Sequence, residues 1–338
     1  SQMFRLAQNN EELPSTGYSD LALSFRSSRE KLNSPPPLIL RRLAQLAAHL
    51  VVALIALFVI GGSTRVMEAG LACPDWPLCF GSFLPGRQMN LQVFLEWFHR
   101  LDAFLVGIVV LIQFILSVFY RRQLPIWLPS AYAFVLFLVI CQGALGALTV
   151  INLLPSTIVT SHLAIGLTLV GIMSVIAKRL FSTCSLVTPL WWRLIGGFAL
   201  GSVLAQCLIG GRMSTSWAAQ RCLSQGLACN WLDLHRNFAI AASLLVFAFV
   251  GSSFFSRGLP RAQWHFLTSI TGLIVIQIFL GIMTIQSSLS QPFLIVSHQL
   301  AAVLLVALLS ALIFGSPQSS IKQFSSSSED PLLEPCHG

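Results

Sequence analysis

The segment at residues 92–119 reads QVFLEWFHRLDAFLVGIVVLIQFILSVF, and it decides the fold class. After Asp102 it carries no charged residue. An α-helix of this length is long enough to cross the roughly 30 Å hydrocarbon core of a bilayer. Seven other segments have the same character: 42–62, 126–150, 156–177, 189–210, 233–255, 263–285 and 292–314. Because backbone polar groups cannot stay unpaired in lipid, we predict an all-α integral membrane protein with eight transmembrane helices.

The composition supports a surface that faces lipid. Hydrophobic residues make up 55% of the chain and charged residues only 9%, with a mean hydropathy of +0.77. Soluble domains carry about 25% charged residues, so the lipid bilayer is the expected partner. The formal net charge is +8, but the basic residues lie mostly in short loops between apolar segments. This distribution is an orientation signal, and no nucleic-acid partner is expected.

The basic residues are divided unevenly between alternate loops. One set of loops and termini carries Arg29, Lys31, Arg41, Arg42, Arg121, Arg122, Lys178, Arg179, Arg193, Arg257, Arg261 and Lys322. The opposite loops carry Arg65, Arg87, Arg212 and Arg221. Since cytoplasmic loops are enriched in Lys and Arg, we predict that the N- and C-termini both lie inside. The polar segments 1–38 and 315–338 are predicted to be disordered tails.

The two halves of the apolar region, 39–180 and 181–314, repeat the same landmarks. Ile60-Gly61-Gly62 recurs as Ile209-Gly210-Gly211, Gly70-Leu-Ala-Cys73 as Gly226-Leu-Ala-Cys229, His99-Arg100 as His235-Arg236, and Ser161-His162 as Ser297-His298. Gln142, Gly146 and Thr149 match Gln277, Gly281 and Thr284 at a constant offset of 135. We therefore predict two pseudo-symmetric four-helix bundles, repeated in parallel about an axis along the membrane normal.

Four histidines occupy equivalent positions in the repeat. His99 and His162 are separated by 63 residues, and so are His235 and His298. Each pair opens the second and fourth helices of its half, which both start from the outer face and can lie diagonally in a bundle. Two neutral imidazoles facing each other across an apolar core are the ligands of a bis-histidine haem. Helix-packing hydrogen bonds are the alternative role for an intramembrane histidine.

Acidic and basic residues adjoin these histidines. Glu96 and His99 share a helix face, whereas the position equivalent to Glu96 in the second half is Leu232. A carboxylate in a haem pocket is suited to proton transfer, although Glu96 could also simply face water. Arg100 and Arg236 follow the first histidine of each half and are candidate partners for haem propionates.

Two cysteine pairs lie in outer loops. Cys73 and Cys79 bracket five residues, and Cys222 and Cys229 bracket six. Both pairs fall on the side where disulfides persist. They are either structural disulfides within the loops or redox-active thiols, and the absence of a Cys-x-x-Cys spacing favours the structural role.

These motifs together resemble the haem A synthase family. The resemblance rests on Gly62-Ser-Thr-Arg65, Gly70-Leu-Ala-Cys-Pro-Asp-Trp-Pro-Leu-Cys79, Glu96-Trp-Phe-His-Arg100, Leu234-His-Arg236 and Ser297-His298, and it covers roughly residues 40–314. The run at 89–103 is similar to the cyanobacterial branch in particular.

The resemblance implies oxidation of the C8 methyl group of haem O to a formyl group, giving haem A for cytochrome oxidase. It implies that His99 and His162 hold haem O as substrate, with Glu96 as the essential acid. His235 and His298 would ligate the iron of a resident haem b. It also implies the disulfides Cys73–Cys79 and Cys222–Cys229.

The same resemblance implies a cellular setting. Haem O synthase and an electron donor are the expected partners. The expected location is a bacterial plasma membrane or a thylakoid, with the haem sites near the outer face.

Three other functions are compatible with the residues alone. A haem b electron carrier would use both histidine pairs equally and give Glu96 no essential role. A membrane thiol oxidoreductase would depend on the cysteines rather than the histidines. A transporter, which a parallel repeat permits, would bind no porphyrin.

Overall fold

The computed structural model describes residues 37–182, 188–256 and 263–317. Nearly all of the two predicted tails, 1–38 and 315–338, lies outside the described residues. Eight long helices run through the described part: α2 (Leu38–Val66), α3 (Leu91–Phe119), α4 (Leu128–Ile151), α5 (Ser156–Phe181), α6 (Leu190–Thr215), α8 (Cys229–Ser252), α9 (Trp264–Gln286) and α10 (Pro292–Phe314). Three short elements lie between them: η1 (Gly86–Gln88), α7 (Ala218–Gln225) and η2 (Ser253–Phe255).

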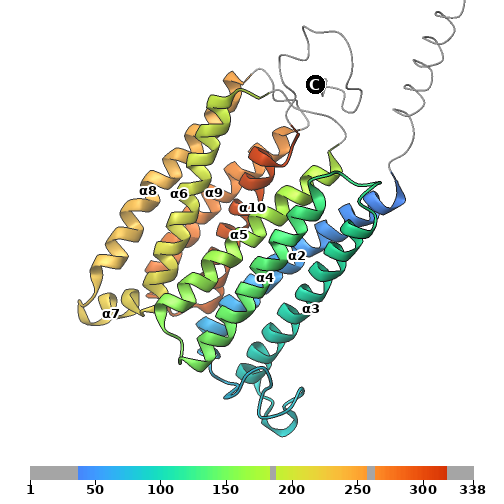
Figure 1. Ribbon diagram of the computed structural model, residues 1–338. Helices are drawn as coiled ribbons and strands as arrows, with labels where there is room; N and C mark the ends of the chain where they lie inside the picture. The colour runs from blue at the N-terminus through green and yellow to red at the C-terminus, as the bar shows by residue number, and fades with distance from the viewer. Residues whose placement is uncertain (1–36, 183–187, 257–262, 318–338) are drawn as a thin grey trace, which may run out of the picture.

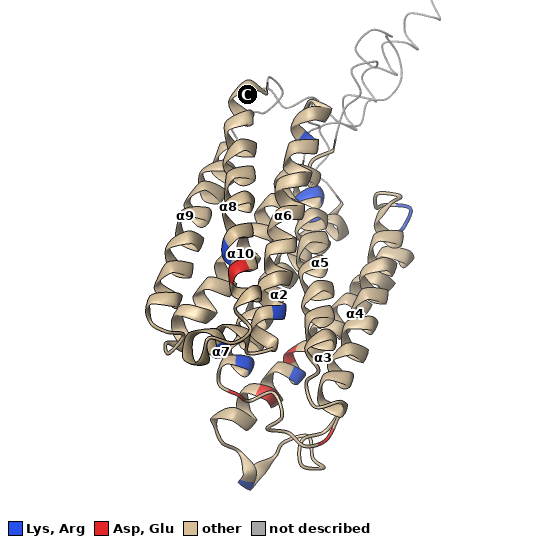
Figure 2. Cartoon of the chain, turned by 90° about the vertical axis from the view of Figure 1, so that its left-hand side faces the viewer, with Lys and Arg blue, Asp and Glu red and all other residues tan. Residues whose placement is uncertain are grey.

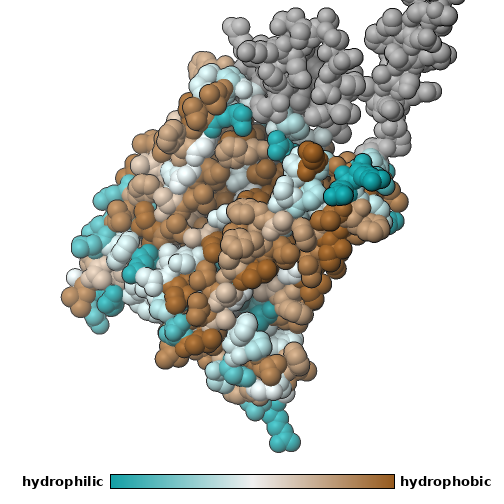
Figure 3. Space-filling view, in the orientation of Figure 1, coloured by the Kyte–Doolittle hydropathy of each residue, from teal (hydrophilic) through white to brown (hydrophobic). Residues whose placement is uncertain are grey.

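All eight predicted membrane spans are confirmed. Each of the long helices is long and apolar enough to cross a bilayer. On the face shown in Figure 3, a broad hydrophobic band lies between more hydrophilic ends. Within the described residues no strand forms beyond one isolated bridge between Cys79 and Ser82. The chain is therefore a multi-pass integral membrane protein.

The helices begin at residues that suit a helix start. The Asn90 side chain accepts a 2.9 Å hydrogen bond from the Val93 N–H and so pairs one of the free donors at the start of α3. Pro155 and Pro189 immediately precede α5 and α6, and α10 starts at Pro292. Proline is tolerated at a helix start because the first N–H groups have no partner within the helix.

The long helices form two rings of four (Figure 1). In the first half α2 packs on α3, α3 on α4, α4 on α5, and α5 on α2. In the second half α6, α8, α9 and α10 pack in the same cyclic order. The halves meet along a seam in which α10 contacts α2 and α5, and α5 also contacts α6. The contacts α2–α10 and α6–α5 are equivalent in the repeat, which confirms two pseudo-symmetric bundles.

The two ends of the molecule differ in charge. The acidic residues of the described ranges are Glu68, Asp75, Glu96, Asp102 and Asp233. All lie toward one end, where α3 and α8 begin (Figure 2). That end also carries residues 67–90, 152–155, 216–228 and 287–291, and it is called here the histidine end.

Close packing across the second half depends on Gly196 in α6. A Cβ atom at this position would lie 2.7 Å from the Phe249 ring of α8 and 2.8 Å from Ile313 of α10. Phe249 is fully buried and lies against the buried Trp192, whose indole N–H donates to the Ser253 hydroxyl. A side chain at Gly196 would therefore force three helices apart.

We expect Gly196→Ala to destabilise the fold by about 1–3 kcal/mol, the usual cost of overpacking a core. Gly197→Ala is the matched control, because a Cβ atom at this neighbouring position meets nothing within 4 Å. Thermal unfolding of the two variants in the same detergent measures the difference. Equal midpoints for Gly196→Ala and Gly197→Ala would contradict the packing argument.

Candidate functional site

The four histidines lie at the same end of the two rings, each on a different helix. His99 and His162 stand on α3 and α5, and His235 and His298 on α8 and α10. In each ring these two helices are diagonal partners, because each packs on the two helices between them. The His235 and His298 rings are 6.5 Å apart at an interplanar angle of 74°. His99 and His162 are close enough to interact electrostatically. The diagonal pairing predicted from the sequence agrees with this arrangement.

A glycine on the neighbouring helix contacts each histidine ring. A Cβ atom on Gly61 would lie 2.9 Å from Cε1 of His99, and one on Gly210 would lie 2.8 Å from Cε1 of His235. The corresponding distances are 3.5 Å from Gly146 to His162 and 3.2 Å from Gly281 to His298. Gly61 and Gly210 thus share one role, which is to let an imidazole pack directly on the backbone of the next helix, whereas a Cβ atom at Gly146 would make only an ordinary contact.

The second glycine of each Gly-Gly pair packs across the seam. Gly62 of α2 contacts the Gln299 side chain of α10, which directly follows His298. In the equivalent position Gly211 of α6 contacts Leu163 of α5, which directly follows His162. Each Gly-Gly pair therefore contacts a histidine of its own half with one residue and the neighbour of a histidine in the other half with the next.

The second histidine pair has the spacing of two imidazoles that share one metal ion. Within the described residues no group of three or more His, Cys, Asp or Glu side chains is placed to hold a metal ion. A metal between two imidazoles, with bonds of about 2 Å, separates the ring centres by about 6 Å. The 6.5 Å between the His235 and His298 rings matches this separation. Nδ1 of His99, His162 and His298 is buried without a hydrogen-bond partner.

Glutamines contact the histidines of the second half. The Gln206 amide nitrogen lies 3.1 Å from Nδ1 of His235 and donates to the backbone carbonyl of the same residue at 2.8 Å. The Gln277 amide nitrogen lies 3.3 Å from Nε2 of His298. The position equivalent to Gln206, by the offset of 149 that relates Gly61 to Gly210, is Leu57. Sequence reasoning missed Gln206 because the repeat gives it no counterpart.

Glu96 is buried rather than facing water. Its side chain is about 5% exposed. One carboxylate oxygen accepts a 2.8 Å hydrogen bond from the Cys73 N–H, and the other pairs with the Arg100 guanidinium. The equivalent residue in the second half, Leu232, is also buried. A buried, ion-paired carboxylate is therefore present beside only one histidine pair.

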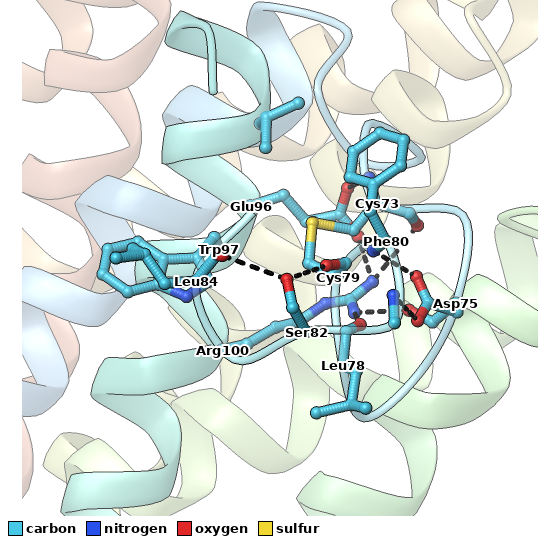
Figure 4. Close-up of a disulfide and its surroundings, with 12 residues drawn as sticks. Cys73, Asp75, Leu78, Cys79, Phe80, Ser82, Leu84, Glu96, Trp97 and Arg100 are labelled. Carbon is cyan, nitrogen blue, oxygen red and sulfur yellow. Dashed lines mark hydrogen bonds and ion pairs between the residues drawn. A yellow bond between two sulfur atoms is a disulfide. The ribbon is translucent and has the colours of Figure 1, made fainter. Parts of the chain in front are cut away.

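Arg100 holds the first loop against Glu96 (Figure 4). Besides the ion pair, its guanidinium donates to the backbone carbonyls of Asp75 at 2.6 Å and Leu78 at 2.7 Å. A longer contact of 3.4 Å reaches the carbonyl of Cys73. These bonds direct Arg100 into the loop, whereas Arg236, its counterpart in the second half, is exposed. The two candidate propionate partners therefore have different surroundings.

Both predicted disulfides, Cys73–Cys79 and Cys222–Cys229, are confirmed. The first is buried within the loop that Arg100 holds, where the Asp75 carboxylate also accepts hydrogen bonds from the N–H groups of Phe80 and Gly81. The second joins α7 to the first residue of α8, six residues before His235. Each disulfide thus fixes a segment near a histidine at the same end of the molecule.

Comparison with known families places the chain. A family described as cytochrome oxidase assembly protein, COX15-CtaA, matches residues 43–310. The chain belongs to this family. The match starts in α2 and ends in α10, so it includes Glu96 and all four histidines.

Several curated relatives of this COX15-CtaA chain are named Heme A synthase. The protein of Shewanella oneidensis is 30% identical over 202 residues, which cover 54% of this chain and 59% of the relative. The protein of Flavobacterium johnsoniae is 23% identical over 321 residues, covering 76% and 92%. That of Geobacillus thermodenitrificans is 34% identical over 121 residues, covering 34% and 35%. The chain thus spans less than two thirds of the length of the first of these relatives.

We expect Arg100→Gln to loosen the loop, because Gln cannot replace the ion pair and the bonds to several carbonyls. The Cys73–Cys79 disulfide should then be reduced by dithiothreitol several-fold faster. Timed alkylation of the released thiols, followed by mass spectrometry, measures the rate. Cys222–Cys229 serves as an internal reference, and Arg87→Gln, which removes an exposed arginine of η1, is the matched control. An unchanged rate for Cys73–Cys79 would show that Arg100 does not hold the loop.

Proposed function

We propose that this protein is a haem A synthase, which oxidises the C8 methyl group of haem O to a formyl group and so provides haem A for cytochrome oxidase. The observation that carries the proposal is the inequality of two otherwise equivalent histidine pairs. Both pairs have the same diagonal helices and glycine contacts, but only the first adjoins a buried carboxylate. The name shared by the relatives supports the same activity.

The two pairs divide the work. His99 and His162 hold haem O as substrate, and His235 and His298 hold the iron of a resident haem b. The resident haem supplies one-electron redox chemistry when bound. Gln206 holds the backbone of His235 in the resident site by donating to its carbonyl.

Glu96 has the proton-handling role. Oxidation of a methyl group to a formyl group releases protons, and a fixed acceptor near the reacting carbon can receive them. The Cys73 N–H and the Arg100 guanidinium hold the Glu96 carboxylate as a hydrogen-bond acceptor. The Cys73 N–H belongs to the loop that the Cys73–Cys79 disulfide closes, and Arg100 belongs to α3, the helix that carries Glu96. Because both donors are held in place, the carboxylate has little freedom to turn away.

The cellular setting follows from the charge bias and the disulfides. The basic loops place both termini inside, so the histidine end faces outward in a bacterial plasma membrane or a thylakoid. Two disulfides at that end agree with an oxidising compartment. Haem O synthase is the proposed source of substrate, and a separate electron-transfer partner completes the reaction.

We expect Glu96→Gln to abolish haem A formation while leaving both haem sites occupied. The amide keeps the size of the side chain but cannot accept a proton. Asp233→Asn, which neutralises an exposed acid of α8, should retain activity. Extracted haems identified by mass spectrometry measure the product. Full haem A yield from Glu96→Gln would contradict the catalytic role.

The division between the pairs is tested by separate histidine variants. His235→Ala and His298→Ala should lose the resident b-type spectrum, whereas His99→Ala and His162→Ala should keep it and accumulate no haem A. A b-type spectrum that survives in all four variants would overturn the assignment. A simple electron carrier would be favoured if haem b occupied both pairs equally and if cells producing Glu96→Gln still grew normally by respiration through cytochrome oxidase.

We expect Gly210→Ala to lower the resident haem content, because the added methyl group would collide with the His235 ring. Gly201→Ala, on the same helix and with nothing within 4 Å of its Cβ position, is the matched control. Haem per protein, from the pyridine haemochrome spectrum, measures the effect. The idea fails if both variants bind haem as the wild type does.

A further inference from the structure

Two arginines at the histidine end reach across the seam in opposite directions. Arg65, in the last turn of α2, donates to the backbone carbonyl of Ser214 in α6 at 2.8 Å. Arg212, in the last turn of α6, donates to the Ser156 hydroxyl at the start of α5 at 2.7 Å. Ser214 lies two residues after Arg212. The Arg65 guanidinium therefore contacts the last turn of α6 that carries Arg212, and the Arg212 guanidinium contacts α5.

Neither arginine has an acidic partner. Within the described residues the only ion pair between side chains is Arg100–Glu96. The Arg65 guanidinium lies 5.8 Å from the centre of the Trp217 ring, and its Nε is buried without a hydrogen-bond partner. The carbonyls at the end of α6 accommodate part of the positive charge. They do not neutralise it, because a carbonyl carries no net charge.

The energetic argument points to a bound anion. A partly buried charge with a buried, unpartnered donor, such as that of Arg65, is costly unless a counter-ion binds it. Charged residues within transmembrane segments usually pair with another charged group or line a path for a substrate or ion. Planar guanidiniums bind carboxylates in a two-pronged geometry that lysine cannot reproduce.

The two arginines also lie at the right level for the haem sites. Arg65 follows Gly61, which contacts His99, by one helical turn. Arg212 follows Gly210, which contacts His235, by two residues. A haem held by these histidines presents two propionate carboxylates at its edge, and no other part of it is anionic. Arg65 and Arg212 therefore lie within about one helical turn of residues that contact His99 and His235, within reach of a carboxylate at a haem edge.

We propose that Arg65 and Arg212 form a carboxylate-binding site at the seam that receives haem propionates, one arginine from each half. The inference rests on the proposed function, since it takes a haem as the ligand. It gives a role to Arg65 of the Gly62-Ser-Thr-Arg65 motif. The seam site also takes over the propionate-binding role expected of Arg100, because the Arg100 donors already bond to Glu96 and the loop carbonyls.

The test compares haem b with haem b dimethyl ester, in which both propionates are esterified. The full-length protein, produced in haem-deficient cells and purified in detergent, is titrated with each compound and followed by absorbance. We expect the wild type to bind the free acid at least about tenfold more tightly than the ester. Arg65→Gln and Arg212→Gln should each reduce this preference toward unity, while binding of the ester itself changes little.

Three further variants separate the alternatives. Arg65→Lys keeps the charge and should retain part of the preference. Arg87→Gln, at an exposed arginine of the same end, should retain all of it. Arg236→Gln tests the rival propionate partner. If Arg236→Gln removes the preference and Arg65→Gln and Arg212→Gln do not, the seam site is wrong.

The failure of this inference differs from the failure of the proposed function. A wild type that binds both compounds equally well would reject the carboxylate site but leave the histidine ligation intact. A wild type that binds neither compound, with no change on replacing His235 or His298, would reject the haem function itself. In that case the arginine site falls with it.

Discussion

The close approach of helices at the Gly-Gly pairs is the constraint on which both sites depend. An imidazole can pack on the backbone of α2 or α6 only because residues 61 and 210 have no side chain. The same turn of each helix must also pack across the seam through residues 62 and 211. Any side chain larger than hydrogen at either position would displace a histidine or separate the halves. Two adjacent glycines meet both requirements in a membrane bundle, where close packing replaces the hydrophobic effect as the source of association.

The repeat supplies symmetric frames, and single residues then make the halves unequal. Glu96 stands opposite Leu232 in the alignment, and Gln206 stands opposite Leu57. The inequality continues away from the histidines, where the fully buried Gln113 of α3 corresponds to Phe249 of α8 by the offset of 136 that relates His99 to His235. Both amide atoms of Gln113 lack a partner. The polar and apolar positions are thus exchanged in both directions: Glu96 and Gln113 are polar only in the first half, and Gln206 only in the second.

The sequence predicted the spans and the ring pairing, because these follow from hydropathy and repeat spacing, and the family resemblance implied both disulfides. It misjudged where α2 ends. The prediction stopped at Gly62, but the helix continues to Val66 because the hydroxyls of Ser63 and Thr64 bond to the carbonyls of Val59 and Ile60 and so remain satisfied in apolar surroundings. The surroundings of Glu96 and Arg100 could not be predicted from the sequence. They depend on how residues 67–90 fold back onto α3, and an irregular loop leaves no periodic signal.

The seam makes the two sites interdependent. Gly62 contacts Gln299 beside His298, while its neighbour Gly61 contacts His99. Gly211 contacts Leu163 beside His162, while Gly210 contacts His235. A shift of α2 therefore moves one ligand of the first pair and the surroundings of one ligand of the second. Because packed helices shift as rigid units, movement of α2 or α6 would be felt at both pairs. The seam formed by α2, α5, α6 and α10 therefore couples the positions of the two histidine pairs.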